Sequence, residues 1–122
     1  MTPEMKQKLD SIVRQHPVVI FMKGNEMFPR CGFSAAAVEA LHRAGAAGKL
    51  HAVDVLEDPE LWESVKEYSD WPTIPQIYVG GEFLGGSDIT REMLESGDLQ
   101  PKIESALRLG EEPGEGYVEG VG

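Results

Sequence analysis

The sequence predicts an α/β domain in which a mixed four-stranded sheet is flanked by helices on both faces. Three observations lead to this prediction. Segments with apolar residues at helical spacing alternate with short runs of strand formers. The run from Val18 to Met22 is uniformly apolar, which is typical of a strand buried on both faces. Gly80 and Gly81 separate two further runs of strand formers, a pattern that favours a tight hairpin.

The first predicted helix covers residues 3–15. Thr2 supplies a capping hydroxyl, Pro3 suits the first helical position, and apolar side chains recur at helical spacing behind them. His16-Pro17 ends this helix because proline cannot continue it. The predicted strand 18–22 follows directly.

The middle of the chain predicts a helix between two strands. A loop over 23–30 leads to Cys31, which stands at the leading end of an alanine-rich helix over 35–47. Glycines at the end of that helix stop it, and residues 50–55 form the second predicted strand.

The C-terminal part predicts a hairpin between helices. Asp58-Pro59-Glu60 again has a cap, a proline and an acid in order, and it begins a helix that ends before Trp71-Pro72. The remaining expected elements are strands 76–79 and 82–84 and helices 89–95 and 99–109.

Length and charge describe one domain with an acidic extension. Residues 1–109 suffice for a single core. Residues 110–122 are rich in glycine and glutamate, so we expect a disordered tail, with partner docking as its alternative role. With 11 Lys plus Arg against 21 Asp plus Glu, the net charge is −10, which argues against nucleic acid and anionic membranes as partners. No apolar run is long enough for a membrane span.

Cysteine usage indicates a reducing compartment. The 122 residues contain 1 cysteine, which cannot form an intramolecular disulfide. The first residues do not form a secretory signal pattern. We therefore expect a cytoplasmic protein, and an organelle matrix after removal of a presequence fits equally well.

Cys31 is the centre of the predicted chemistry. A lone cysteine is usually a small buried side chain, but the N-terminus of a helix stabilises a thiolate, and Lys23 and Arg30 add positive charge nearby. A thiolate can act as a nucleophile or as a metal ligand. Ser34 stands where a dithiol oxidoreductase has its second cysteine, so a mixed disulfide on Cys31 would need an external thiol such as glutathione to resolve it.

Four motifs in order resemble the monothiol glutaredoxins of the Cys-Gly-Phe-Ser class over roughly residues 3–109. They are Lys23-Gly24, Pro29-Arg30-Cys31-Gly32-Phe33-Ser34, Trp71-Pro72-Thr73-Ile74-Pro75-Gln76 and Gly85-Gly86-Ser87-Asp88. The resemblance implies a thioredoxin fold, glutathione binding and a [2Fe-2S] cluster shared between two chains. A [2Fe-2S] cluster usually has four thiolate ligands. Because each chain has one, Cys31 of two chains and two glutathione thiols would complete the set.

The resemblance also implies a glutathione site. Lys23 would face the glycyl carboxylate, and a cis proline at Ile74-Pro75 would present its backbone to the cysteinyl part. Ser87 and Asp88, behind Gly86, would hold the γ-glutamyl end at a helix N-terminus. Phe33 would pack either beside the cluster or in the core.

The chain departs from the family pattern at two positions. Trp62 replaces an arginine that many members direct at the glycyl carboxylate, and Lys66, one turn further on, is a candidate substitute. Ser87 replaces a second cysteine. Trp71 would either gate the groove or, as the stronger expectation, be a buried aromatic at a strand entrance. The three histidines, His16, His42 and His51, lack zinc-site spacing with Cys31.

The primary hypothesis is a carrier that assembles the cluster at a homodimer interface, with Cys31 as iron ligand and redox-active cysteine, and transfers it to iron–sulfur acceptor proteins. The family also suggests a BolA-like partner. The alternative is a weak enzyme, a glutathione-dependent reductase of protein–glutathione mixed disulfides with Cys31 as catalytic nucleophile. A redox sensor that is glutathionylated at Cys31 is a third hypothesis.

Overall fold

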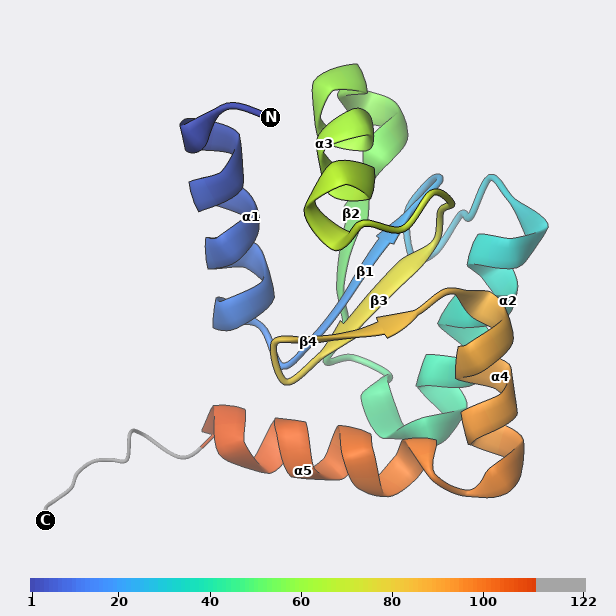
Figure 1. The fold of residues 1–122 in the computed structure, drawn as a ribbon. Helices are drawn as coiled ribbons and strands as arrows, with labels where there is room; N and C mark the ends of the chain where they lie inside the picture. The colour runs from blue at the N-terminus through green and yellow to red at the C-terminus, as the bar shows by residue number, and fades with distance from the viewer. Residues whose placement is uncertain (112–122) are drawn as a thin grey trace, which may run out of the picture.

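The computed structural model describes residues 1–111 and confirms the predicted architecture (Figure 1). The helices are α1 (Pro3–Gln15), α2 (Gly32–Leu41), α3 (Pro59–Ser69), α4 (Ser87–Ser96) and α5 (Leu99–Glu111). A π-helical turn η1 (His42–Ala46) extends α2, and a 3-10 turn η2 (Val55–Glu57) precedes α3. The strands are β1 (Val18–Met22), β2 (His51–Asp54), β3 (Gln76–Val79) and β4 (Glu82–Gly85).

The four strands form one mixed sheet in the order β2-β1-β3-β4. β1 runs parallel to β2, with Val19 opposite His51, and antiparallel to β3, with Ile20 opposite Ile77. β3 and β4 are the predicted hairpin, and the turn residues Gly80 and Gly81 both have positive φ (62° and 81°). Glycine adopts these angles without strain, which explains the sharp reversal.

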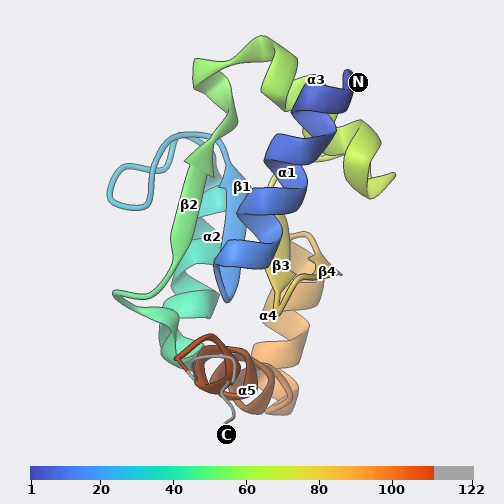
Figure 2. The same ribbon diagram turned by 90° about the vertical axis from the view of Figure 1, so that its left-hand side faces the viewer.

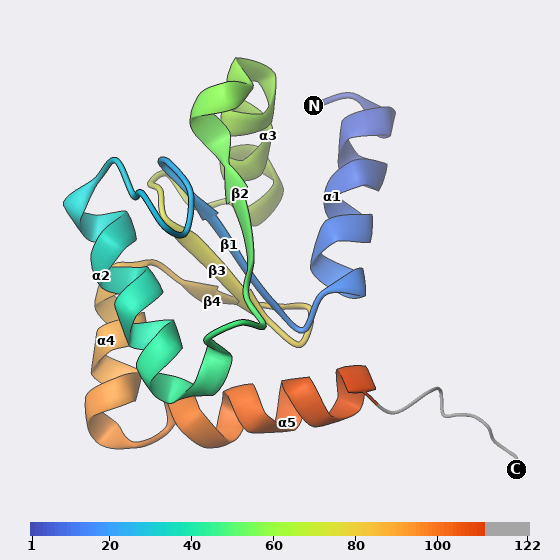
Figure 3. The same cartoon turned by 180° about the vertical axis from the view of Figure 1, so that it is seen from behind.

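Helices cover both faces of the sheet, α1 and α3 on one side and α2, α4 and α5 on the other (Figures 1 and 3). Figure 2 shows α1 in front of the sheet, on the face that it shares with α3. The side chains of β1 alternate between two buried clusters: Val18, Ile20 and Met22 pack with α2 and α5, whereas Val19 and Phe21 pack with α1 and α3. The uniform apolar run of β1 is therefore explained by burial on both faces.

Local capping signals place the helix starts as predicted. Thr2 Oγ1 accepts a hydrogen bond from the Met5 N–H (3.0 Å), and Asp58 Oδ1 accepts from the N–H groups of Glu60 (3.0 Å) and Leu61 (3.3 Å). These bonds satisfy first-turn donors that have no partner inside the helix.

Several boundaries differ from the predictions. The alanine-rich helix begins at Gly32, and its last turn, His42–Ala46, is π-helical and contains Gly45, whose φ is 109°. α4 begins at Ser87 rather than at residue 89. α5 reaches Glu111, just past the predicted domain end, and the rest of the predicted tail lies outside the described residues. Within residues 1–111, no helix is long and apolar enough to cross a membrane.

Candidate functional site

Cys31 is the N-cap residue of α2 and is partly exposed. The pKa of its thiol is lowered, first by the Ser34 N–H; partial burial opposes this, and the Phe33 N–H, the charge of Lys23 and the Ser34 hydroxyl lower it further. The N–H groups of the first turn of α2, together with the charge of Lys23, therefore stabilise the thiolate form. The expectation of an activated thiol at this helix end agrees with the geometry.

The loop before Cys31 is held in place by its backbone. The Arg30 N–H donates to the Lys23 carbonyl (2.8 Å), and the Gly24 N–H donates to Asp54 Oδ1 (3.0 Å) at the end of β2. Gly24 has a φ of +88°, and a β-carbon there would lie 2.6 Å from the Arg30 nitrogen. The contact between Asp54 and Gly24 could not be predicted from the sequence, because the two residues meet only when β1 and β2 pair.

The tip of this loop is ordered but exposes apolar side chains. Asn25 Oδ1 accepts from the N–H groups of Met27 (3.0 Å) and Phe28 (2.9 Å), and Glu26 pairs with His42 Nε2. Met27 and Phe28 are 81% and 71% exposed. The loop therefore presents two exposed apolar side chains at its tip.

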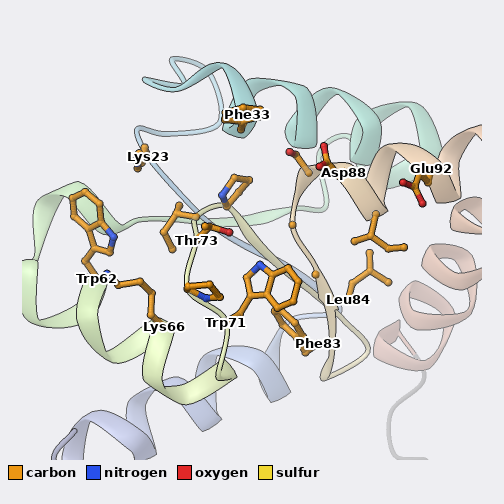
Figure 4. A pocket seen from close by; sticks show the side chains of 17 residues that line it. Lys23, Phe33, Trp62, Lys66, Trp71, Thr73, Phe83, Leu84, Asp88 and Glu92 are labelled. Atoms are coloured by element: carbon orange, nitrogen blue, oxygen red, sulfur yellow. The ribbon is translucent and has the colours of Figure 1, made fainter.

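A pocket of about 780 Å³ lies between the N-termini of α2 and α4, the segment before β3, and α3. Figure 4 shows its side chains. Seven of the eight predicted binding residues line it, whereas Cys31 lies outside the lining beside Phe33. The lining is Lys23, Phe33, Trp62, Lys66, Trp71, Pro72, Thr73, Ile74, Pro75, Phe83, Leu84, Gly85, Gly86, Ser87, Asp88, Ile89 and Glu92.

Two lysines lie at the same end of the pocket, and the ammonium groups of both lie close to one indole ring. The Lys23 Nζ lies 5.3 Å and the Lys66 Nζ 6.0 Å from the ring centroid of Trp62. Cation–π attraction keeps both ammonium groups at this end, although Lys66 also pairs with Glu63 (3.1 Å). Lys66 thus occupies the same end as Lys23, where the sequence suggested that it could substitute for an arginine.

The middle wall of the pocket is apolar. The Ile74–Pro75 peptide is cis, in agreement with the resemblance. Trp71 is 41% exposed and packs against Phe83 (ring centroids 5.7 Å apart), so the expectation of a buried indole is wrong. Phe33 is 63% exposed, and its alternative placement in the core is also wrong.

The far end of the pocket is acidic and lies at the N-terminus of α4. Gly86 is the N-cap residue, Ser87 is buried, and Asp88 and Glu92 line the pocket. Figure 4 places Lys23 and Lys66 at the opposite end from Asp88 and Glu92. An elongated molecule with a carboxylate at one end and an ammonium group at the other would match this arrangement.

The histidines have partners of their own, since His42 pairs with Glu26 and the other two stack on each other. His16 and His51 stack with ring centroids 3.7 Å apart, and the pKa of His51 is lowered by burial and then by the neighbouring His16. Within residues 1–111, no three His, Cys, Asp or Glu side chains gather where they could hold a metal ion.

We expect alkylation of Cys31 by iodoacetamide to proceed near neutral pH and to slow as the pH falls through the lowered thiol pKa. Ser34→Ala removes the hydroxyl, the smallest of these causes, but keeps the Ser34 N–H, so the midpoint of the pH profile should rise only slightly. Ser64→Ala, a buried serine on α3, should leave the midpoint unchanged. A large rise of the midpoint in the Ser34 variant would contradict the dominance of the backbone N–H.

Comparisons with known proteins agree with this geometry. The profile of the family described as glutaredoxin matches residues 18–84. The protein named monothiol glutaredoxin-5, mitochondrial, of Saccharomyces cerevisiae is 46% identical over 110 residues, 89% of this chain and 73% of the yeast protein. The solution structure of reduced poplar apo GrxS14 superposes with a TM-score of 0.76 at 48% identity, over 88% of this chain and 96% of the poplar chain.

A more distant solved structure shares the fold. The crystal structure titled buckwheat glutaredoxin–glutathione complex has a TM-score of 0.73 at 21% identity, over 87% of this chain and 96% of the buckwheat chain.

Proposed function

Because the chain belongs to the glutaredoxin family and has its thioredoxin fold, we propose that it binds glutathione and carries a [2Fe-2S] cluster as a two-chain complex. Membership of the monothiol branch supports a glutathione-linked redox or iron–sulfur role. The observation that carries the finer proposal is one stabilised thiol, Cys31, next to a pocket with opposite charges at its two ends.

Glutathione would lie along the pocket with its two charged ends apart. Its glycyl carboxylate would face Lys23 and Lys66, and its cysteinyl backbone would pair with the extended segment at Pro75. The first N–H groups of α4 would hold the γ-glutamyl carboxylate, and the carboxylate of Asp88 would accept from its ammonium group. The glutathione complex of the buckwheat glutaredoxin supports this class of ligand.

The cluster would be cargo. Four thiolates complete its ligand set, and each chain contains one cysteine, so two Cys31 thiolates and two glutathione thiolates would hold it between two chains. Transfer would proceed by ligand exchange: each acceptor thiolate forms an iron–sulfur bond as one outgoing thiolate leaves, and no electron is transferred. A dissociable ligand such as glutathione makes that exchange easier.

The partners and compartment follow from the same proposal. Iron–sulfur acceptor proteins and a BolA-like protein stay predictions from the family resemblance. The net charge of −10 argues against nucleic acid. We infer a reducing compartment, the cytoplasm or an organelle matrix, and the yeast relative is named as mitochondrial.

Anaerobic cluster reconstitution tests the proposal. The native chain and Cys31→Ser are each incubated with iron and sulfide under three conditions: with glutathione, with 2-mercaptoethanol, and without any thiol. Cluster binding is followed by visible absorption, and the oligomeric state by size-exclusion chromatography. We expect a coloured dimer only from the native chain with glutathione, because 2-mercaptoethanol lacks the charged ends that the pocket would hold. If the native chain bound no iron after reconstitution but rapidly removed glutathione from a glutathionylated test protein, the carrier proposal would be overturned and the reductase would remain.

A further inference from the structure

Gln76 is a polar side chain in an apolar interior. It begins β3, lies opposite Phe21 of β1 and is completely buried (0% exposed). A buried carboxamide has lost its hydrogen bonds to water, so both its donor and its acceptor end require partners inside the protein.

The donor end of Gln76 binds the pocket wall. Its Nε2 donates to the carbonyl of Trp71 (2.9 Å) and to the carbonyl of Thr73 (3.2 Å). Both carbonyls belong to the segment 71–75, every residue of which lines the pocket. At the start of the segment, the Trp71 N–H donates to the Lys66 carbonyl (3.1 Å). The Gln76 side chain thereby ties this segment to the start of β3, a central strand of the sheet.

The acceptor end of Gln76 is not satisfied. Within residues 1–111, Oε1 has no hydrogen-bond partner. Turning the carboxamide over would place Oε1 against two carbonyl oxygens, so the observed orientation is the better of the two. An apolar side chain of similar volume would avoid the unpaired oxygen, but it would also remove the donor from both carbonyls. The two bonds to the segment therefore explain a glutamine here.

We propose that Gln76 is a positioning residue for ligand binding: its two hydrogen bonds hold Trp71 and the Ile74–Pro75 backbone in the arrangement that receives glutathione. The inference rests on glutathione binding as proposed above. Preorganisation of this kind raises affinity because the segment is already ordered before the ligand arrives. Gln76 itself does not line the pocket.

Two variants of the full chain test this role by calorimetric titration with glutathione. Gln76→Met removes both donors at similar volume, and we expect the dissociation constant to rise about tenfold while the urea midpoint stays close to that of the native chain. Gln76→Glu places a carboxylate against two carbonyls at pH 7.5. A protonated carboxyl can donate one bond, so its affinity relative to the native chain should partly recover at pH 5.5, whereas that of the methionine variant should not.

Ile77→Val is the matched control, because Ile77 is equally buried in β3 but faces the opposite cluster. It should leave the affinity unchanged. Hydrogen exchange of the Trp71 N–H, which donates to the Lys66 carbonyl (3.1 Å), gives a readout that does not depend on glutathione. We expect this exchange to be faster in Gln76→Met than in the native chain and in Ile77→Val. Native affinity and native exchange in Gln76→Met would overturn the inference. A native chain that does not bind glutathione would overturn the proposed function, and the exchange rates would still decide the role of Gln76.

Discussion

Gly24→Ala is expected to lower the free energy of unfolding by about 2–4 kcal/mol. Gly24 has a φ of +88°, which a residue with a β-carbon rarely adopts, and the added carbon would lie 2.6 Å from both the Arg30 nitrogen and the Phe28 oxygen. Both are backbone atoms and cannot rotate away as a side chain could. The loop that leads to Cys31 would therefore have to open. Urea unfolding of the native and variant chains measures the loss.

Gly32→Ala is the matched control for this prediction. Gly32 lies in the first turn of α2, and a β-carbon there would meet nothing within 4 Å. Alanine also restricts the unfolded chain, so this variant should be neutral or more stable by about 0.4–1 kcal/mol. Equal destabilisation of the two variants would show that the loss at Gly24 does not come from its φ and its close backbone contacts.

Lys23→Met is expected to weaken glutathione binding about tenfold to a hundredfold, because the glycyl carboxylate of glutathione would lose one charge-assisted hydrogen bond. Lys66→Met should have a smaller effect, since Glu63 already pairs with that ammonium group (3.1 Å). Trp62 lies beside both ammonium groups, so the two lysines should not act independently. Calorimetric titration of both single variants and the double variant gives their coupling energy.

Lys102→Met provides the control for net charge. Lys102 pairs with Glu82 (3.2 Å) and does not line the pocket, so its replacement removes the same charge from the chain without touching the proposed site. It should leave glutathione affinity unchanged at physiological salt. An effect as large as that of Lys23→Met would mean that overall charge, rather than a specific contact, governs binding.

Local signals determined much of this protein. The caps at Thr2 and Asp58, the apolar run of β1 and the glycine pair of the hairpin act over a few residues, and each produced the expected element. The single Cys31 and its place before a helix likewise follow from the chain alone. These features are predictable because their causes, backbone geometry and side-chain spacing, lie within one turn or one strand.

The tertiary structure alone decided how the candidate site is built. Gly24 meets Asp54 30 residues away, and Trp62 lies beside Lys23, because β1, β2 and α3 pack at the same end of the sheet. The sequence favours a buried Trp71, yet its indole packs against Phe83 and stays 41% exposed in the pocket wall. Such contacts depend on which elements become neighbours and on what fills the space between them. Local propensity and periodicity do not contain that information, because it arises from packing across the whole domain.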